Sequence, residues 1–205
     1  MGDTPEQRIA EDPQAQNDER ELEPAGLTPA ELRSRQAALA RLRQWGDPVL
    51  RSDTRPVERF DDKFKADVRY MIELMHDAFG IGLAAPQIGR SRRVFVYQVG
   101  DQPAIVLANP TVEYLSQDEE TALEGCLSLA NVQVDVNRPV HVRVTGQDIN
   151  GDEITIEASG LEARVIQHEF DHLNGVLILD RASKDQRRAA LRALLEAEEQ
   201  SGFAA

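Results

Sequence analysis

Residues 165–175 read Val-Ile-Gln-His-Glu-Phe-Asp-His-Leu-Asn-Gly and contain the pattern His-Glu-x-x-His. On an α-helix, His168 and His172 lie about one turn apart, so both imidazoles leave the same face and can bind one metal ion. Glu169 stands beside them as a candidate base. A hydrogen-bonded pair of core histidines would give the same pattern, so a third ligand is needed to decide between the two interpretations.

The sequence around this pattern predicts one helix with an inward-facing stripe. Ser159 followed three residues later by Glu162 is typical of a capping box, and Gly175 is a typical helix end. Leu161 and Val165 fall on the same arc of a helical wheel as the two histidines. We therefore expect this arc to be buried.

Three routes could supply the third metal ligand. A metzincin-type protease would continue the motif to a third histidine, but Ile178 stands at that position. A gluzincin-type protease would use a glutamate of a later helix, such as Glu196 or Glu199. The third route is Cys126, the only cysteine, in the segment 124–128 that reads Glu-Gly-Cys-Leu-Ser. A thiolate binds soft and borderline metals well, although a lone cysteine is often a small buried hydrophobic residue.

Three segments of the chain together resemble a known family. Residues 80–89 read Gly-Ile-Gly-Leu-Ala-Ala-Pro-Gln-Ile-Gly, residues 124–128 read as above, and residues 167–175 read Gln-His-Glu-Phe-Asp-His-Leu-Asn-Gly. In this order they resemble the three signature motifs of the peptide deformylases. The resemblance extends over about residues 42–180. It departs from the family where Ala130 and Asn137 stand at positions that commonly hold proline, in a loop that lines the substrate.

The resemblance implies a fold and a metal centre. The expected fold is α+β, with antiparallel or mixed sheets wrapped around a central helix that carries His-Glu-x-x-His, followed by a C-terminal helix. The metal would be one divalent ion per chain held by Cys126, His168 and His172. Fe²⁺ is the usual metal of the family, and Zn²⁺ or Ni²⁺ can replace it.

The implied activity is hydrolysis of the formyl group from the initiator methionine of nascent polypeptides, with release of formate. Glu169 would act as general base and then general acid toward a metal-activated water. Gln87 and the backbone N–H of Leu127 would donate hydrogen bonds to the developing oxyanion. The methionine side chain would enter a pocket whose candidate walls are Gly80, Ile81, Gly82, Leu161 and Val165.

Two other functions remain open at this stage. One is a metallopeptidase of another type that uses a glutamate as third ligand. The other is a catalytically weak paralogue that keeps the fold and the metal but acts as a binding protein, which the departures at Ala130 and Asn137 motivate.

The chain outside the motifs predicts three parts. Residues 1–26 hold eight acidic residues against two arginines, a net charge of −6, so we expect a flexible acidic tail. Within residues 27–41, a capping box at Thr28 predicts an extension helix from about Pro29 to Gln44. Residues 42–205 would form the catalytic domain. Its last helix, residues 183–200, begins with basic residues that could contact the ribosome, or it is simply solvated.

Other elements follow from periodicity. An amphipathic helix is expected from Asp62 to Phe79, and a hairpin turn at Asn150-Gly151. His76 and His141 are interpreted as structural. Strands are expected at residues 94–99, 104–108, 111–115, 132–136, 140–144 and 154–156, with a further strand beginning at Cys126 and Leu127.

Charge and composition indicate the setting. The net charge of −13 argues against general binding to DNA or other nucleic acids. No apolar run approaches the roughly 18 residues of a membrane span, and the N-terminus does not resemble a signal peptide. A single cysteine as a thiolate ligand requires reducing surroundings, so we expect a cytoplasmic protein without a membrane partner.

Overall fold

The computed structural model describes residues 26–202, which form the α+β fold expected from the sequence. One sheet has the strand order β1-β2-β3-β6-β7, and β4 pairs with β5 in a second sheet; all these pairs are antiparallel. The strands are β1 (Gly82–Ala84), β2 (Val94–Tyr97), β3 (Ile105–Leu115), β4 (Glu119–Cys126), β5 (Leu129–Pro139), β6 (His141–Gln147) and β7 (Glu153–Ser159). The helices are α1 (Pro29–Leu39), α2 (Asp62–Asp77), α3 (Gly160–Leu173), α4 (Ile178–Arg181) and α5 (Lys184–Gly202), with short 3₁₀ helices η1 (Pro48–Arg51) and η2 (Ala85–Ile88). The predicted acidic tail, apart from Gly26, lies outside the described residues.

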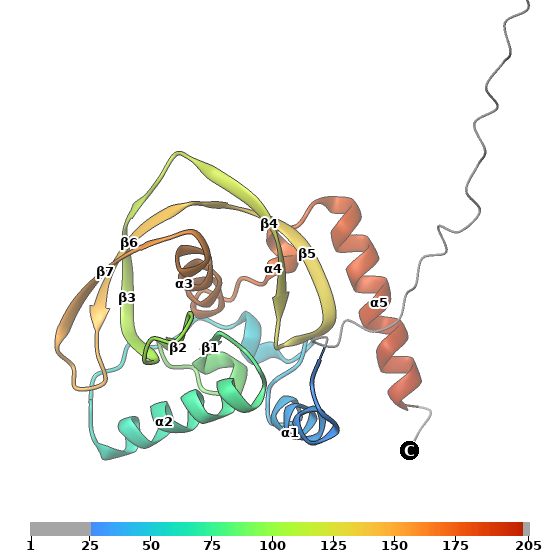
Figure 1. Ribbon diagram of the computed structural model, residues 1–205, viewed down its shortest axis with the longest axis horizontal. Helices are drawn as coiled ribbons and strands as arrows, with labels where there is room; N and C mark the ends of the chain where they lie inside the picture. Colours follow the sequence, from blue (N-terminus) through green and yellow to red (C-terminus); the bar gives the residue numbers. More distant parts are fainter. Residues whose placement is uncertain (1–25, 203–205) are drawn as a thin grey trace, which may run out of the picture.

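Helix α3 lies in the interior of the molecule, and the two sheets curve around it (Figure 1). Val165, Ile166 and Leu173 of this helix are buried in one hydrophobic cluster with residues of the five-stranded sheet. The helix also contacts β5 of the second sheet. Because α3 carries His-Glu-x-x-His, the packing of both sheets determines where the two histidines lie.

The start of α3 differs from the predicted capping box. Ser159 is at the N-cap position, but its side chain does not cap the helix: its hydroxyl lies 2.8 Å from Nδ1 of His141. Glu162 instead accepts a hydrogen bond of 2.9 Å from the hydroxyl of Tyr97. Tertiary partners therefore compete successfully with the local motif. The helix ends before Gly175, which has a φ of +68°, in agreement with the prediction.

Helix α2 lies along one edge of the fold and buries one side in a second hydrophobic cluster. The Asp61 carboxylate caps its start by accepting from the N–H of Phe64. The helix ends at Asp77 rather than at the predicted Phe79, because Phe79 adopts a left-handed φ of 56°. His76 lies 2.6 Å from the side-chain oxygen of Gln98, which agrees with its predicted structural role.

Helix α1 starts as predicted and ends earlier. Thr28 and Glu31 form both hydrogen bonds of the capping box. The helix stops at Leu39, whereas the sequence predicted Gln44. The reason is tertiary, because the N–H of Arg43 donates to a carbonyl group of η2 instead of continuing the helix.

Two strand predictions differ from the structure. Residues 105–108 and 111–115 are extended as predicted, but they belong to the single strand β3, whose pairing with β6 continues past a register shift at Asn109-Pro110. Cys126 ends a strand, β4, and does not begin one. The sequence of β4 contains Thr121 as its one β-branched residue, so it carried little strand signal.

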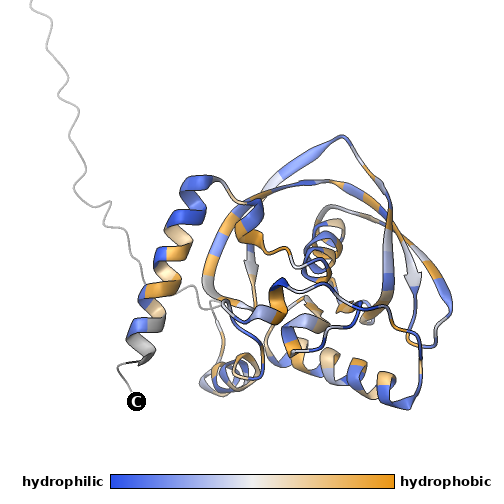
Figure 2. Cartoon of the chain, turned by 180° about the vertical axis from the view of Figure 1, so that it is seen from behind, coloured by the Kyte–Doolittle hydropathy of each residue, from blue (hydrophilic) through white to orange (hydrophobic). Residues whose placement is uncertain are grey.

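The last helix, α5, packs on the outside of β5 (Figure 1). Ala190 and Leu194 are buried against Val134 and Val136 of that strand. Figure 2 shows that the first turns of α5 are hydrophilic and that its middle is hydrophobic. Among residues 26–202 there is no helix long and apolar enough to cross a membrane.

Candidate metal centre and active site

Three candidate ligand side chains meet at the junction of the two sheets. Cys126 comes from the end of β4, and His168 and His172 come from one face of α3. Their ligand atoms all lie within 4.8 Å of one another, and Sγ of Cys126 is 3.2 Å from Nε2 of His172. In the described part of the chain, this is the one cluster of its kind, and it includes neither Glu196 nor Glu199.

The donor atoms of this cluster fit a divalent metal. Nδ1 of His168 is 3.0 Å from Oε2 of Glu124, which leaves Nε2 of His168 available as a ligand. Burial lowers the pKa of His172 well below 6.5, so its imidazole is neutral, as a metal ligand must be. One thiolate and two imidazoles suit iron, zinc and nickel alike.

A network of buried ion pairs centred on Glu124 contacts Nδ1 of His168, the ring nitrogen that faces away from the ligand cluster. The Glu124 carboxylate accepts from Nε and Nη2 of Arg138 at 2.6 and 3.0 Å, and from Arg164 at 2.8 Å. Arg138 also donates to Asp171 at 2.8 Å. Burial by itself would raise the pKa of Glu124. The hydrogen bonds and charges of His168 and Arg138 outweigh this effect and lower the pKa to about 2. Glu124 is therefore ionised and holds the His168 ring in one orientation.

This network was not recognised from the sequence, and Arg138 was not among the candidate site residues. One signal was present: Asp171, inside the His-Glu-x-x-His helix, is an acidic residue on a segment predicted to be buried. A buried carboxylate requires a cationic partner. Nothing in the sequence indicated which arginine it would be.

Glu169 lies beside the ligand cluster and is 4% exposed. Burial raises the pKa of its carboxyl to about 7, although the charges of His168 and Arg138 oppose the shift. Its Oε2 atom is buried and has no hydrogen-bond partner among the described residues. Such a carboxyl can take up and release a proton near neutral pH.

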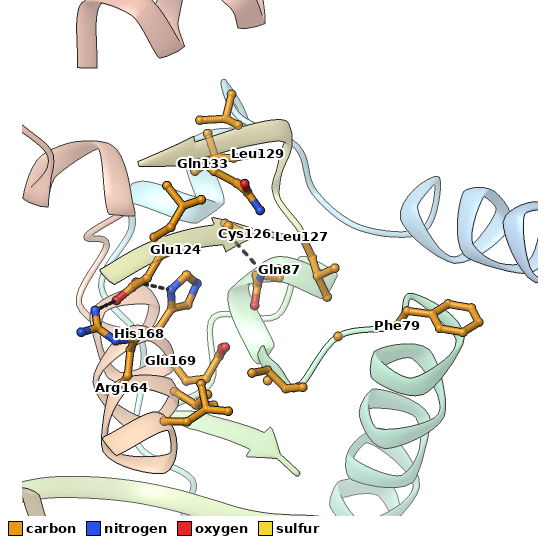
Figure 3. A pocket seen from close by; sticks show the side chains of 18 of the residues that line it. Phe79, Gln87, Glu124, Cys126, Leu127, Leu129, Gln133, Arg164, His168 and Glu169 are labelled. Atoms are coloured by element: carbon orange, nitrogen blue, oxygen red, sulfur yellow. Dashed lines mark hydrogen bonds and ion pairs between the residues drawn. The ribbon is translucent and has the colours of Figure 1, made fainter. Parts of the chain in front are cut away.

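Gln87 and Leu127 lie on the other side of the cluster. The Gln87 side-chain oxygen accepts from the N–H of Ala84 at 2.8 Å, which directs its Nε2 to within 3.2 Å of the Ser128 hydroxyl and 3.8 Å of Cys126 Sγ. Leu127 is in the turn between β4 and β5, and within residues 26–202 its N–H forms no hydrogen bond. Figure 3 shows Cys126, Gln87, His168 and Glu169 around one pocket.

This pocket has a volume of about 390 Å³ and brings together all the residues predicted to bind substrate. Leu161 is 55% exposed at its rim, so the expectation that the whole helical arc would be buried was wrong for this residue. The predicted substrate residues that line the pocket are Gly80, Ile81, Gly82, Leu161 and Val165. The lining also includes residues that the sequence did not indicate, among them Arg35, Leu39, Phe79, Leu123 and Gln133.

The segment that follows α1 connects two of the motif loops. The N–H of Arg43 donates to the carbonyl of Gln87 at 2.7 Å, and the N–H of Trp45 donates to the carbonyl of Ser128 at 2.8 Å. Between them, Nε2 of Gln44 donates to the carbonyl of Leu127 at 3.2 Å. These contacts fix the Leu127 turn relative to Gln87.

The α+β fold, with a Cys-His-His cluster next to a buried glutamate, defines a metal-dependent hydrolase. The sequence model of the family described as polypeptide deformylase matches residues 39–188. The chain belongs to this family, and its activity is removal of the N-formyl group from peptides. A metallopeptidase of another type and a binding protein are not favoured.

Individual relatives agree with this assignment. The peptide deformylase of Thermotoga sp. (strain RQ2) is 45% identical over 156 residues, which cover 76% of this chain and 94% of that protein. The crystal structure of peptide deformylase from Thermotoga maritima has a TM-score of 0.68 at 45% identity and covers 70% of this chain and 97% of that one. The peptide deformylase from Synechococcus elongatus in complex with actinonin has a TM-score of 0.72 at 44% identity, covering 74% and 84% respectively.

Proposed function

We propose that this chain hydrolyses the formyl group from the N-terminal methionine of nascent polypeptides, using one divalent metal held by Cys126, His168 and His172. The observation that carries the proposal is the convergence of these ligands within 4.8 Å, next to the buried Glu169 and in the wall of one pocket. When bound, the metal supplies Lewis-acid chemistry, since it polarises a carbonyl and lowers the pKa of water. Fe²⁺ is the proposed native ion, with Zn²⁺ or Ni²⁺ as substitutes.

The residues of the chain have separate roles in this proposal. Glu169 accepts the proton of the attacking water and passes it to the leaving amine, and its pKa of about 7 suits both steps. Nε2 of Gln87 and the N–H of Leu127 donate to the oxyanion that forms on the formyl group. Glu124 keeps His168 in position as a ligand.

The pocket recognises the methionine side chain. Its apolar walls, Ile81, Leu161 and Val165, provide the contact surface for a flexible thioether side chain. Gly80 and Gly82 carry no Cβ, so the side chains of Leu127 and Glu169 can lie against their backbone in the pocket wall.

The proposal is tested by formate release from formyl-Met-Ala-Ser, with anaerobic handling and metal content measured in the same sample. Glu169→Ala should retain the metal and lose turnover by about 100-fold or more. Cys126→Ala should lose the metal, whereas Glu196→Ala should keep both metal and turnover. Undiminished turnover in Glu169→Ala would contradict the mechanism, and a metal-loaded wild type that releases no formate would favour a binding protein.

We also propose that the enzyme acts in the cytoplasm and meets its substrate at the ribosome. The support is the exposed basic start of α5, which can contact phosphates through Lys184, Arg187, Arg188 and Arg192. Co-sedimentation with ribosomes should weaken in Arg188→Glu. It should be unchanged in the control Arg143→Glu, which alters an exposed arginine of β6.

A further inference from the structure

One side chain at the mouth of the pocket comes from outside the segment that matches the family. Arg35 and Leu39 lie one turn apart on α1, and both line the pocket. The family match begins only at residue 39, so Arg35 lies outside the matched segment.

Helix α1 is held firmly enough to keep Arg35 in place. It lies beside α2, next to the turn between β4 and β5 (Figure 1). Ala38 and Leu42 are 2% and 5% exposed in the cluster that also contains the buried face of α2. Just beyond the helix, Nε of Arg41 donates to the Tyr70 hydroxyl at 3.1 Å. Arg35 is thus presented by a docked element.

The charge of Arg35 is not balanced by the other residues of the pocket. Glu124, Arg164 and His168 pair with one another, and Glu169 lies deeper, beside the ligand cluster. Within the described part of the chain, Arg35 forms no ion pair, and its Nε is covered by protein atoms without an acceptor. The Arg35 guanidinium therefore has hydrogen-bonding capacity that no described residue uses.

We propose that Arg35 forms a subsite for a carboxylate side chain of the formylated peptide, at one of the positions after formyl-methionine. This inference rests on the proposed function. A guanidinium can hold a carboxylate through two parallel hydrogen bonds. The other exposed side chains of the rim carry no charge: Phe79, Ile81, Leu123 and Leu161 are apolar, and Gln133 is a neutral amide. Arg35 is therefore the element of the rim that distinguishes peptides by charge.

The test compares formyl-Met peptides that carry Glu, Gln or Lys at the second, third or fourth position. At low salt, the wild type should show a kcat/KM about three- to fivefold higher for Glu than for Gln at one of these positions. The difference should appear mainly in KM and shrink as salt is added. Arg35→Gln should bring the Glu-to-Gln ratio close to one, and Arg35→Glu should favour Lys. Arg33→Gln, a change of an exposed arginine on the same helix, should keep the wild-type ratio.

The possible outcomes distinguish a failure of the Arg35 subsite from a failure of the proposed deformylase activity. Equal hydrolysis of the Glu and Gln peptides by the wild type, or a preference that survives in Arg35→Gln, would overturn the Arg35 subsite alone. Failure of the wild type to release formate from any of the peptides would overturn the proposed function itself.

Discussion

The Glu169 carboxylate lies directly against the backbone of Gly82 on strand β1. A Cβ atom at Gly82 would overlap Oε1 of Glu169 and stand 2.9 Å from its Cδ. Because Gly82 has no side chain, Glu169 of the His-Glu-x-x-His motif can lie beside the ligand cluster.

We expect Gly82→Ala to displace the Glu169 carboxylate while leaving the metal ligands in place. A displacement of about 1 Å at a reacting group can lower the rate about 100-fold, so kcat should fall by about 10- to 100-fold with unchanged metal content. The control is Gly146→Ala, where a Cβ would stand 2.8 Å from the carbonyl oxygen of Ala108, away from the pocket. This control should lose stability and retain kcat; equal kcat values for wild type and Gly82→Ala would contradict the prediction.

Arg138→Leu should strongly reduce stability. The change leaves Glu124 and Asp171 buried without their shared cation, and breaking a buried ion pair typically costs about 3–5 kcal/mol. Urea unfolding at pH 7, with both proteins free of metal, measures the difference. Arg143→Leu is the matched control, because its pair with Glu157 is exposed and should contribute less than about 1 kcal/mol. Similar losses in the two variants would show that burial does not govern the cost.

Gln44→Ala should slow the reaction without affecting metal binding. The change removes the side-chain donor to the carbonyl of Leu127, and one such hydrogen bond contributes about 0.5–1.5 kcal/mol. If the contact holds the Leu127 turn in its active geometry, kcat should fall by about two- to tenfold. Gln186→Ala removes a comparable bond to Asp135 on the surface and should leave kcat unchanged. A fall in stability alone, with wild-type kcat, would refute the positioning role of Gln44.

Asp180→Asn should alter the response to acid. Burial by itself would raise the pKa of Asp180. The hydrogen bonds from Arg51 and the Leu177 N–H outweigh this effect, so the pKa lies below 3.8. A carboxyl with a lowered folded-state pKa stabilises the protein above its unfolded pKa and loses that contribution as the pH falls through the folded pKa. The variant should therefore be less stable than the wild type at pH 7, by about 1 kcal/mol for a partly exposed pair.

The difference in unfolding free energy between the wild type and Asp180→Asn should become smaller as the pH falls below about 3.8, which is the pKa of Asp180 in the unfolded chain. Urea unfolding at pH 7 and at pH 3 tests this. A gap that stays constant between the two pH values would show that the Asp180 carboxylate does not contribute through its charge.

Several features of this protein follow from sequence alone, because local chemistry determines them. The spacing of His168 and His172 requires a helix to bring both rings to one metal, and α3 has that geometry. The capping box at Thr28 starts α1, and the apolar periodicity of α2 predicts its buried side. Such signals act over a few residues, so they can be recognised without knowledge of the fold.

Other features were decided only by the tertiary structure, because they depend on contacts between distant segments. Gln44 reaches Leu127 across 83 residues of sequence, and Arg138 reaches Asp171 across 33. The same long-range packing diverts Ser159 and Glu162 from their local motif and places Arg35 at the pocket. A polar side chain can satisfy its hydrogen bonds with many partners, and the sequence does not specify which partner lies within reach. The packing of both sheets around α3 determines which partner each polar side chain reaches.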